Sequence, residues 1–133
     1  MSTLPWKLEA AAMTTQKLEL MTSIAVAFSR NPMTLAYLGD DLQKLSQGRF
    51  ILGLGSQVKA HIERRFSMPW SKPAARMREM VEAIKTIWRC WETGERLNFE
   101  GEFNAMMAMM IKTPITNFIY PYVIHLKPPS IKN

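Results

Sequence analysis

The stretch Phe50-Ile51-Leu52-Gly53-Leu54-Gly55-Ser56-Gln57 decides how the rest of this chain is interpreted. It is a short apolar run with two glycines, and it ends in small polar residues. Such a run is consistent with a buried strand. Ser46-Gln47-Gly48 precedes it, and a glycine after a helical pattern favours a helix end because it accepts the left-handed conformation. The stretch therefore predicts a helix that stops at Gly48, a tight turn, and a buried strand.

The segment before this strand predicts a helix and a second strand. Asn31 can cap a helix, and Pro32 suits the first helical position. The apolar stripe that follows has a helical period and consists of Leu35, Leu38, Leu42 and Leu45. Upstream, residues 18–28 are apolar on both faces, as a buried parallel strand requires. Strand, helix and strand form a βαβ unit with parallel strands, which is the repeating element of a β/α-barrel.

Three further helices are expected. Residues 5–15 carry a weak helical pattern, and residues 57–66 can form a short helix. The clearest pattern covers residues 73–93 and ends at Gly94. Its apolar stripe, which we expect to lie in the core, consists of Met77, Met80, Val81, Ile84, Ile87, Trp88 and Trp91.

The character of the chain changes after Asn104. Residues 97–103 alternate apolar and polar side chains, which predicts a short exposed strand or hairpin. Beyond them there is neither a sustained period nor a cap. The methionine run at 106–110 lacks the histidine or cysteine partners of a soft-metal site, and we expect no metal. We divide the chain into an α/β segment, 1–104, and a divergent tail, 105–133.

Composition narrows the class of protein. With 133 residues, 47% of them apolar and 21% charged, the chain is globular in composition. A single cysteine excludes an internal disulfide and fits a reducing compartment. No secretory signal or membrane-length apolar run is evident, so we expect a cytoplasmic protein with no membrane partner. The net charge of +6 is scattered along the chain, which indicates a mixed solvated surface and no nucleic-acid binding.

An ordered series of motifs across residues 18–103 closely resembles the luciferase-like monooxygenase family, especially its branch of oxidoreductases that use the deazaflavin coenzyme F-420. The matching segments are Thr22 to Phe28, Arg30 to Pro32, Asp41-Leu42, Leu45 to Phe50, Gly53 to Gln57, His61 to Phe66, Pro69-Trp70, Arg76 to Glu79, and Phe99 to Phe103. One such motif alone would mean little, but their order and spacing are specific. The family position matching Asn104 usually holds an aromatic residue.

The resemblance implies a partial TIM (β/α)8 barrel of the bacterial luciferase type, truncated at both ends. Residues 18–28 would be its third strand and residues 50–55 its fourth. Members bind the deazaflavin or FMN at the carboxyl end of the barrel and are often dimers. We therefore expect an F-420 site, with FMN as the alternative, a small organic substrate, and a possible homo-oligomer. Hydride transfer or monooxygenation would be the chemistry, with little activity from this chain alone. The alternative function is a non-catalytic interaction or oligomerisation module.

Ligand-facing groups of a barrel lie where its strands end. This rule selects Ala27 to Ser29 after the first strand, and Gly55, Ser56 and Gln57 after the second. Glycines at 53 and 55 would let a flat ring or a phosphate approach the backbone, and Ser56 and Gln57 offer polar groups to it. The resemblance adds a non-prolyl cis peptide near Ser23-Ile24 that supports the ring. The alternative is a glycine-rich turn with incidental polar groups.

The catalytic residue is not identified by the sequence. His61 is the candidate, because it is the only histidine in the matched region and its ordinary pKa suits proton transfer. Packing of its ring on the short helix is an equal alternative. Glutamates 63, 79 and 82 form no recognisable acid–base pair.

Overall fold

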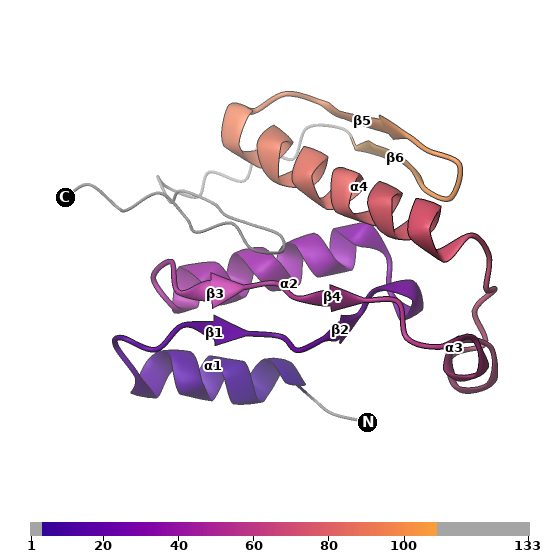
Figure 1. The fold of residues 1–133 in the computed structure, drawn as a ribbon. Coiled ribbons are helices and arrows are strands. Elements are labelled where there is room, and N and C mark those ends of the chain that lie inside the picture. Colours follow the sequence, from indigo (N-terminus) through magenta and orange to yellow (C-terminus); the bar gives the residue numbers. More distant parts are fainter. Residues whose placement is uncertain (1–3, 109–133) are drawn as a thin grey trace.

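A computed structural model describes residues 4–108 of the chain (Figure 1). The elements, in order, are α1 (Leu4–Thr14), β1 (Leu20–Met21), β2 (Ala25–Val26), the 3-10 turn η1 (Ala27–Ser29), α2 (Pro32–Leu45), β3 (Phe50–Ile51), β4 (Leu54–Gly55), α3 (Lys59–Phe66), α4 (Pro73–Thr93), β5 (Leu97–Glu100) and β6 (Ala105–Ala108). All four predicted helices are present. None of the helices in residues 4–108 combines the length and the apolar character needed to cross a membrane.

The four short central strands form two parallel pairs. β1 pairs with β3, where Leu20 lies opposite Phe50, and β2 pairs with β4, where Ala25 lies opposite Leu54. Helix α2 follows β2 in the chain and leads to β3. Figure 1 shows the segment of β1 and β2 running beside the segment of β3 and β4. This arrangement confirms the predicted parallel βαβ unit, on which the barrel interpretation depends.

The prediction of two continuous strands is wrong in detail. Each predicted strand divides into two short ladders, and Thr22 provides the physical reason. Its hydroxyl donates to the carbonyl of Gly53 and accepts the Gly53 N–H, both at 2.8 Å. A side chain thus replaces the backbone groups that would continue the ladder. Burial on both faces also fails, because Leu18, Met21 and Ile24 are exposed.

The ends of the main helices follow the predicted signals. Asn31 Oδ1 accepts the N–H of Thr34 at 2.8 Å, and Pro32 occupies the first turn of α2. Gly94 closes α4 in the left-handed conformation, with a φ of 77°. After α2 two residues, Gln47 and Gly48, adopt the left-handed conformation, and only the glycine was predicted to do so. Both helices therefore begin and end where local sequence directs them.

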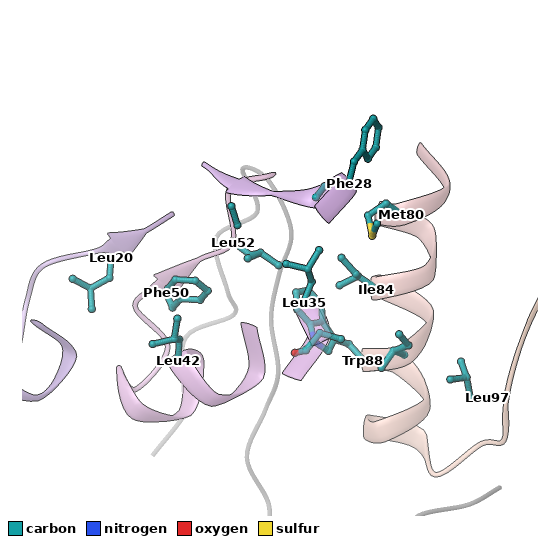
Figure 2. Close-up of a cluster of buried hydrophobic side chains, with 14 of the residues drawn as sticks. Leu20, Phe28, Leu35, Leu42, Phe50, Leu52, Met80, Ile84, Trp88 and Leu97 are labelled. Carbon is teal, nitrogen blue, oxygen red and sulfur yellow. The ribbon is translucent and has the colours of Figure 1, made fainter. Parts of the chain in front are cut away.

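The core lies between the strands, α2 and α4. Helix α2 packs against both α1 and α4, and Figure 2 shows Leu35 facing Ile84 and Trp88 across that interface. The indole N–H of Trp88 donates to the carbonyl of Ala36 at 2.9 Å. Gly39 gives the indole room, because a Cβ there would press on it. The predicted core role of Trp88 is confirmed.

Arg49 fastens α1 to the strand unit at the end of the molecule where β1 and β3 begin. Its Nε donates to the carbonyl of Ser46 at 2.8 Å. Its two terminal nitrogens donate to the hydroxyl and carbonyl of Thr15 and to the carbonyls of Ala12 and Leu18. One guanidinium thereby satisfies carbonyls at the carboxyl end of α1 that the helix itself leaves free.

A hairpin of β5 and β6 lies along α4, as predicted for residues 97–103. Leu97 pairs with Ala108 in an antiparallel ladder. The carboxylate of Glu79, on α4, accepts the N–H groups of Phe103 and Asn104 at 2.9 and 2.6 Å, so this buried side chain holds the hairpin turn against the helix. The division predicted at residue 104 falls within this hairpin. It stays a prediction, because residues 109–133 lie outside the described part.

Candidate cofactor site

Parallel pairing of β2 and β4 brings together Ile24, the residue directly before β2, and Gly55, the last residue of β4. The side chain of Ile24 lies directly against Gly55, where a Cβ would collide with its Cδ1 atom. The peptide bond between Ser23 and Ile24 is cis, as the family resemblance implied. Ile24 is 40% exposed, and Ser23 is exposed as well. An exposed apolar side chain at the start of β2 therefore packs over the glycine that ends β4.

The reason for the two glycines differs from the prediction. A Cβ on Gly53 would collide with the carbonyl oxygen of Thr22, and the space beside Gly55 is taken by Ile24. Both glycines therefore make room for the neighbouring strand. That they also admit a ligand stays a prediction, and the exposed side chain beside them is Ile24.

Gln57 and His61 extend this surface into the start of α3. Gln57 has a φ of 61°, a left-handed conformation that is uncommon for a non-glycine residue. Its Oε1 lies 3.2 Å from Nδ1 of His61, and Ser56 Oγ donates to its carbonyl at 3.1 Å. Because an amide oxygen only accepts, this contact is a hydrogen bond in the tautomer that carries its proton on Nδ1, and that tautomer leaves Nε2 outside the contact. We call Ser23, Ile24, Gly55, Ser56, Gln57 and His61 the strand-end site.

The residues predicted after the first strand do not join this site. Ala27 and Phe28 are fully buried in the core, because the chain turns into η1 immediately after β2. Ser29 donates through its hydroxyl to the carbonyl of Val26 at 3.1 Å. The strand-end rule fails here because the strand stops two residues earlier than the apolar pattern indicates.

A pocket that was not predicted lies beside η1. It is an open pocket of about 600 Å³, which we call the rim pocket; its lining is Ser29, Arg30, Asn31, Thr34, Met68, Pro69, Arg76, Met80, Phe103 and Asn104. These residues come from the start of α2, the loop before α4, α4 itself and the hairpin turn. Several of these segments carry family motifs, but their sequence does not show that they meet, and only the fold joins them.

The two groups with a displaced pKa lie outside both sites. Burial raises the pKa of the Asp40 carboxyl, although its hydrogen bond to Lys44 opposes that shift. Burial and the charge of Glu95 raise the pKa of the Cys90 thiol. Within residues 4–108 no three histidine, cysteine, aspartate or glutamate side chains are grouped to hold a metal ion.

Comparison with known proteins identifies the family. The sequence model of the luciferase-like monooxygenase family matches residues 6–126 of this chain. The chain therefore belongs to the luciferase-like monooxygenase family, as the motif series indicated. Its mixed α/β fold corresponds to part of the TIM-barrel domain of that family.

Relatives and solved structures agree with this family. An uncharacterised protein of Mycobacterium tuberculosis is 61% identical over 93 residues, which are 70% of this chain and 27% of that protein. A putative coenzyme F-420-dependent oxidoreductase of the same organism is 35% identical over 74 residues, 56% of this chain and 21% of the relative. The chain thus spans about a quarter of the length of these relatives.

Two solved monooxygenases share the fold. The monooxygenase RslO1 from Streptomyces bottropensis has a TM-score of 0.71 at 26% identity, over 90% of this chain and 35% of that one. The oxygenating constituent of 3,6-diketocamphane monooxygenase from Pseudomonas putida, solved in complex with FMN, has a TM-score of 0.67 at 18% identity, over 79% of this chain and 30% of that one. The second likeness concerns the fold alone.

Proposed function

We propose that the strand-end site forms part of the ring-binding surface of a flavin-type oxidoreductase, and that coenzyme F-420 is its cofactor, with FMN as the alternative. The observation that carries this proposal is the contact of the exposed Ile24, directly before β2, with Gly55 at the end of the parallel strand β4. A relative is named as F-420-dependent, and a fold neighbour was solved with FMN. The closer motif match ranks the deazaflavin first.

The surface suits a flat heteroaromatic ring. Ile24 offers an exposed apolar side chain, and no Cβ rises beside it at Gly55. Ser23 precedes Ile24, and Ser56 and Gln57 follow Gly55, so the chain next to this patch carries hydroxyl and amide groups that can bond ring carbonyls. Polar groups at the edge of an apolar floor fix the orientation of a ring, while the floor supplies most of the buried area.

A bound deazaflavin supplies hydride transfer to or from a small organic substrate. The chain's own residues position that ring and manage protons. Nδ1 of His61 contacts Gln57 Oε1, so Nε2 is the imidazole nitrogen outside this contact, and we assign proton exchange to it. The left-handed Gln57 makes this pairing possible, because it turns the chain from β4 toward α3. We propose that the chain binds cofactor but turns over little substrate by itself, since the family barrel has eight strands.

Fluorescence titration of the full chain with F-420 and with FMN tests this proposal. We expect saturable quenching of the ring fluorescence, stronger for F-420, and at least about tenfold weaker binding in Ile24→Asp and Gln57→Ala. Val58→Ala is the matched control, because Val58 is exposed and lies beside Gln57 outside the site. Absence of quenching by either cofactor, or equal affinity in all three variants, would exclude the strand-end site.

A second candidate function, an interaction or oligomerisation module, is favoured by a different observation. Within the described residues, β1 and β2 pair only with β3 and β4, so one side of each strand is open. The exposed apolar side chains of Leu18, Met21 and Ile24 lie along that segment. Open edges of this kind favour pairing with another chain. The fluorescence titration distinguishes the two functions, because only the oxidoreductase function requires cofactor binding.

A further inference from the structure

We propose that the rim pocket binds an organic anion, a carboxylate or a phosphate attached to an apolar body. The pocket lies between η1, α2, the loop before α4, and the hairpin turn. None of the strand-end residues lines it, so the inference does not depend on which cofactor the chain binds. Its lining combines two arginines with methionine and phenylalanine side chains.

Arg76 is held in place before any ligand arrives. Its Nη1 donates to the carbonyl of Pro69 at 2.6 Å. Its guanidinium lies 4.5 Å from the ring centre of Phe28 and 5.8 Å from that of Phe103. Phe28 is itself fixed in the core and contacts Trp70 edge-on. A guanidinium has five N–H donors, so most remain for a ligand, and a planar fork fixed on aromatic rings loses little entropy when it binds an oxyanion.

The charge of the pocket is not neutralised from within. Arg30 supplies a second positive charge, and among the described lining residues none is acidic. The nearest carboxylate on the same face of α4, Glu79, is occupied by the two N–H groups of the hairpin turn and by the side-chain amide of Asn104 at 2.9 Å. No described carboxylate forms an ion pair with Arg76. The lining itself therefore carries two positive charges and no negative one.

The remaining walls define the rest of the ligand. Met68, Met80 and Phe103 offer apolar surface on the same pocket as the arginines. Thr34 and Asn104 add neutral polar groups at its edge. An anion that also carries an apolar ring would use both kinds of wall, whereas a bare inorganic ion would leave the apolar wall unused. The ligand that fits this pocket is therefore an organic anion that also carries an apolar group.

Calorimetric titration of the full chain with benzoate and with phenyl phosphate, in the absence of any cofactor, tests the inference. Both ligands carry a ring, and their relative affinities decide between carboxylate and phosphate. Benzamide is the neutral control of the same shape, and we expect it to bind at least about tenfold more weakly. Affinity should fall with rising salt, because the attraction is partly electrostatic. Equal binding of benzamide, or no binding of either anion, would overturn the proposal.

Substitutions locate the binding. Arg76→Met and Arg30→Met should each weaken anion binding at least about tenfold, and Arg76→Lys should weaken it less than Arg76→Met, since it keeps charge but loses the fork. Arg78→Met is the matched control, because it removes the same charge from an exposed position of α4 outside the pocket. Circular dichroism checks that each variant is folded. If Arg76→Met does not fold, the anion affinity of Arg30→Met tests the proposal. Unchanged affinity in Arg30→Met, or equal loss in Arg78→Met, contradicts the assignment.

Discussion

Gly53 and Gly55 lie two residues apart, and at each of them the absence of a side chain makes room for a different neighbouring group. At Gly53 the neighbour is the backbone carbonyl of Thr22, which cannot move without breaking the strand pairing. At Gly55 it is the flexible end of Ile24. We therefore expect Gly53→Ala to lower the free energy of unfolding by about 3 kcal/mol and Gly55→Ala by about 1 kcal/mol.

Urea denaturation measures both values, and the cofactor titration separates their consequences. Gly55→Ala should displace Ile24 and weaken F-420 binding more than its small effect on stability implies. Equal destabilisation by the two substitutions would show that the Thr22 carbonyl can move aside as easily as the side chain of Ile24.

Asp40 is predicted to make stability depend on pH in the direction opposite to that of most carboxylates. Burial raises its pKa above the usual 3.8, and one of its carboxylate oxygens, Oδ1, has no hydrogen-bond partner. A raised pKa in the folded state means that the folded chain binds more protons than the unfolded chain, so this group's contribution to stability falls as pH rises through the interval above 3.8.

Comparison with Asp40→Asn isolates this contribution. The stability of the native chain relative to that of the variant should decrease as pH rises from about 4 to about 7, because the variant cannot ionise. Urea denaturation at several pH values gives the two curves. A constant difference between them would mean that the Lys44 hydrogen bond offsets the burial of Asp40.

At the scale of elements, Arg49 adds polar contacts to the apolar packing that attaches α1 to the strand unit. Its guanidinium donates to four carbonyls and one hydroxyl. Arg49→Lys keeps the charge but cannot reproduce that fork, and we expect a loss of about 2 kcal/mol with faster hydrogen exchange in α1. Arg96→Lys, at an exposed position, is the control. If exchange in α1 is unchanged, packing against α2 alone must hold the helix.

The hairpin depends on a single carboxylate. Glu79→Gln retains the size of the side chain, but its amide NH2 would face N–H groups that now bond to a carboxylate oxygen. We expect a loss of about 2 kcal/mol and faster exchange of the Phe103 and Asn104 amides. Glu82→Gln, on the exposed face of the same helix, should change neither quantity. Equal effects of both substitutions would assign the stabilisation to general charge on α4.

The helices could be predicted from the sequence and the strand limits could not, for a physical reason. Helix ends are set by local groups such as Asn31, Pro32 and Gly94, which act within a few residues. Strand limits depend on a partner far along the chain. The hydroxyl of Thr22 interrupts pairing through Gly53, which lies 31 residues away, and no local pattern reveals that contact.

At the scale of the whole molecule, the strand-end site and the rim pocket differ in how far the sequence predicts them, as the helix ends and strand limits do. The strand-end site could be anticipated, because Gly55, Ser56 and Gln57 follow a buried strand and the family resemblance adds Ser23 and Ile24. The rim pocket could not, because Arg30, Arg76 and Phe103 come from separate segments and are joined by tertiary packing. Glu79 shows the limit most clearly, since its sequence position gives no sign of the hairpin turn that it holds.

The open edge of the strand unit leads to the last prediction, which concerns association. Met21 lies in β1, is 51% exposed, and in the described part of the chain β1 pairs only with β3. A strand edge with apolar side chains favours pairing between copies, whereas a lysine on such an edge opposes it. We therefore expect the mass measured by light scattering to rise with concentration in the native chain and to rise much less in Met21→Lys. Met13→Lys places the same charge on the more exposed face of α1 and should leave association unchanged. A chain that stays monomeric at every concentration, or equal suppression by both lysines, would show that this edge does not mediate pairing.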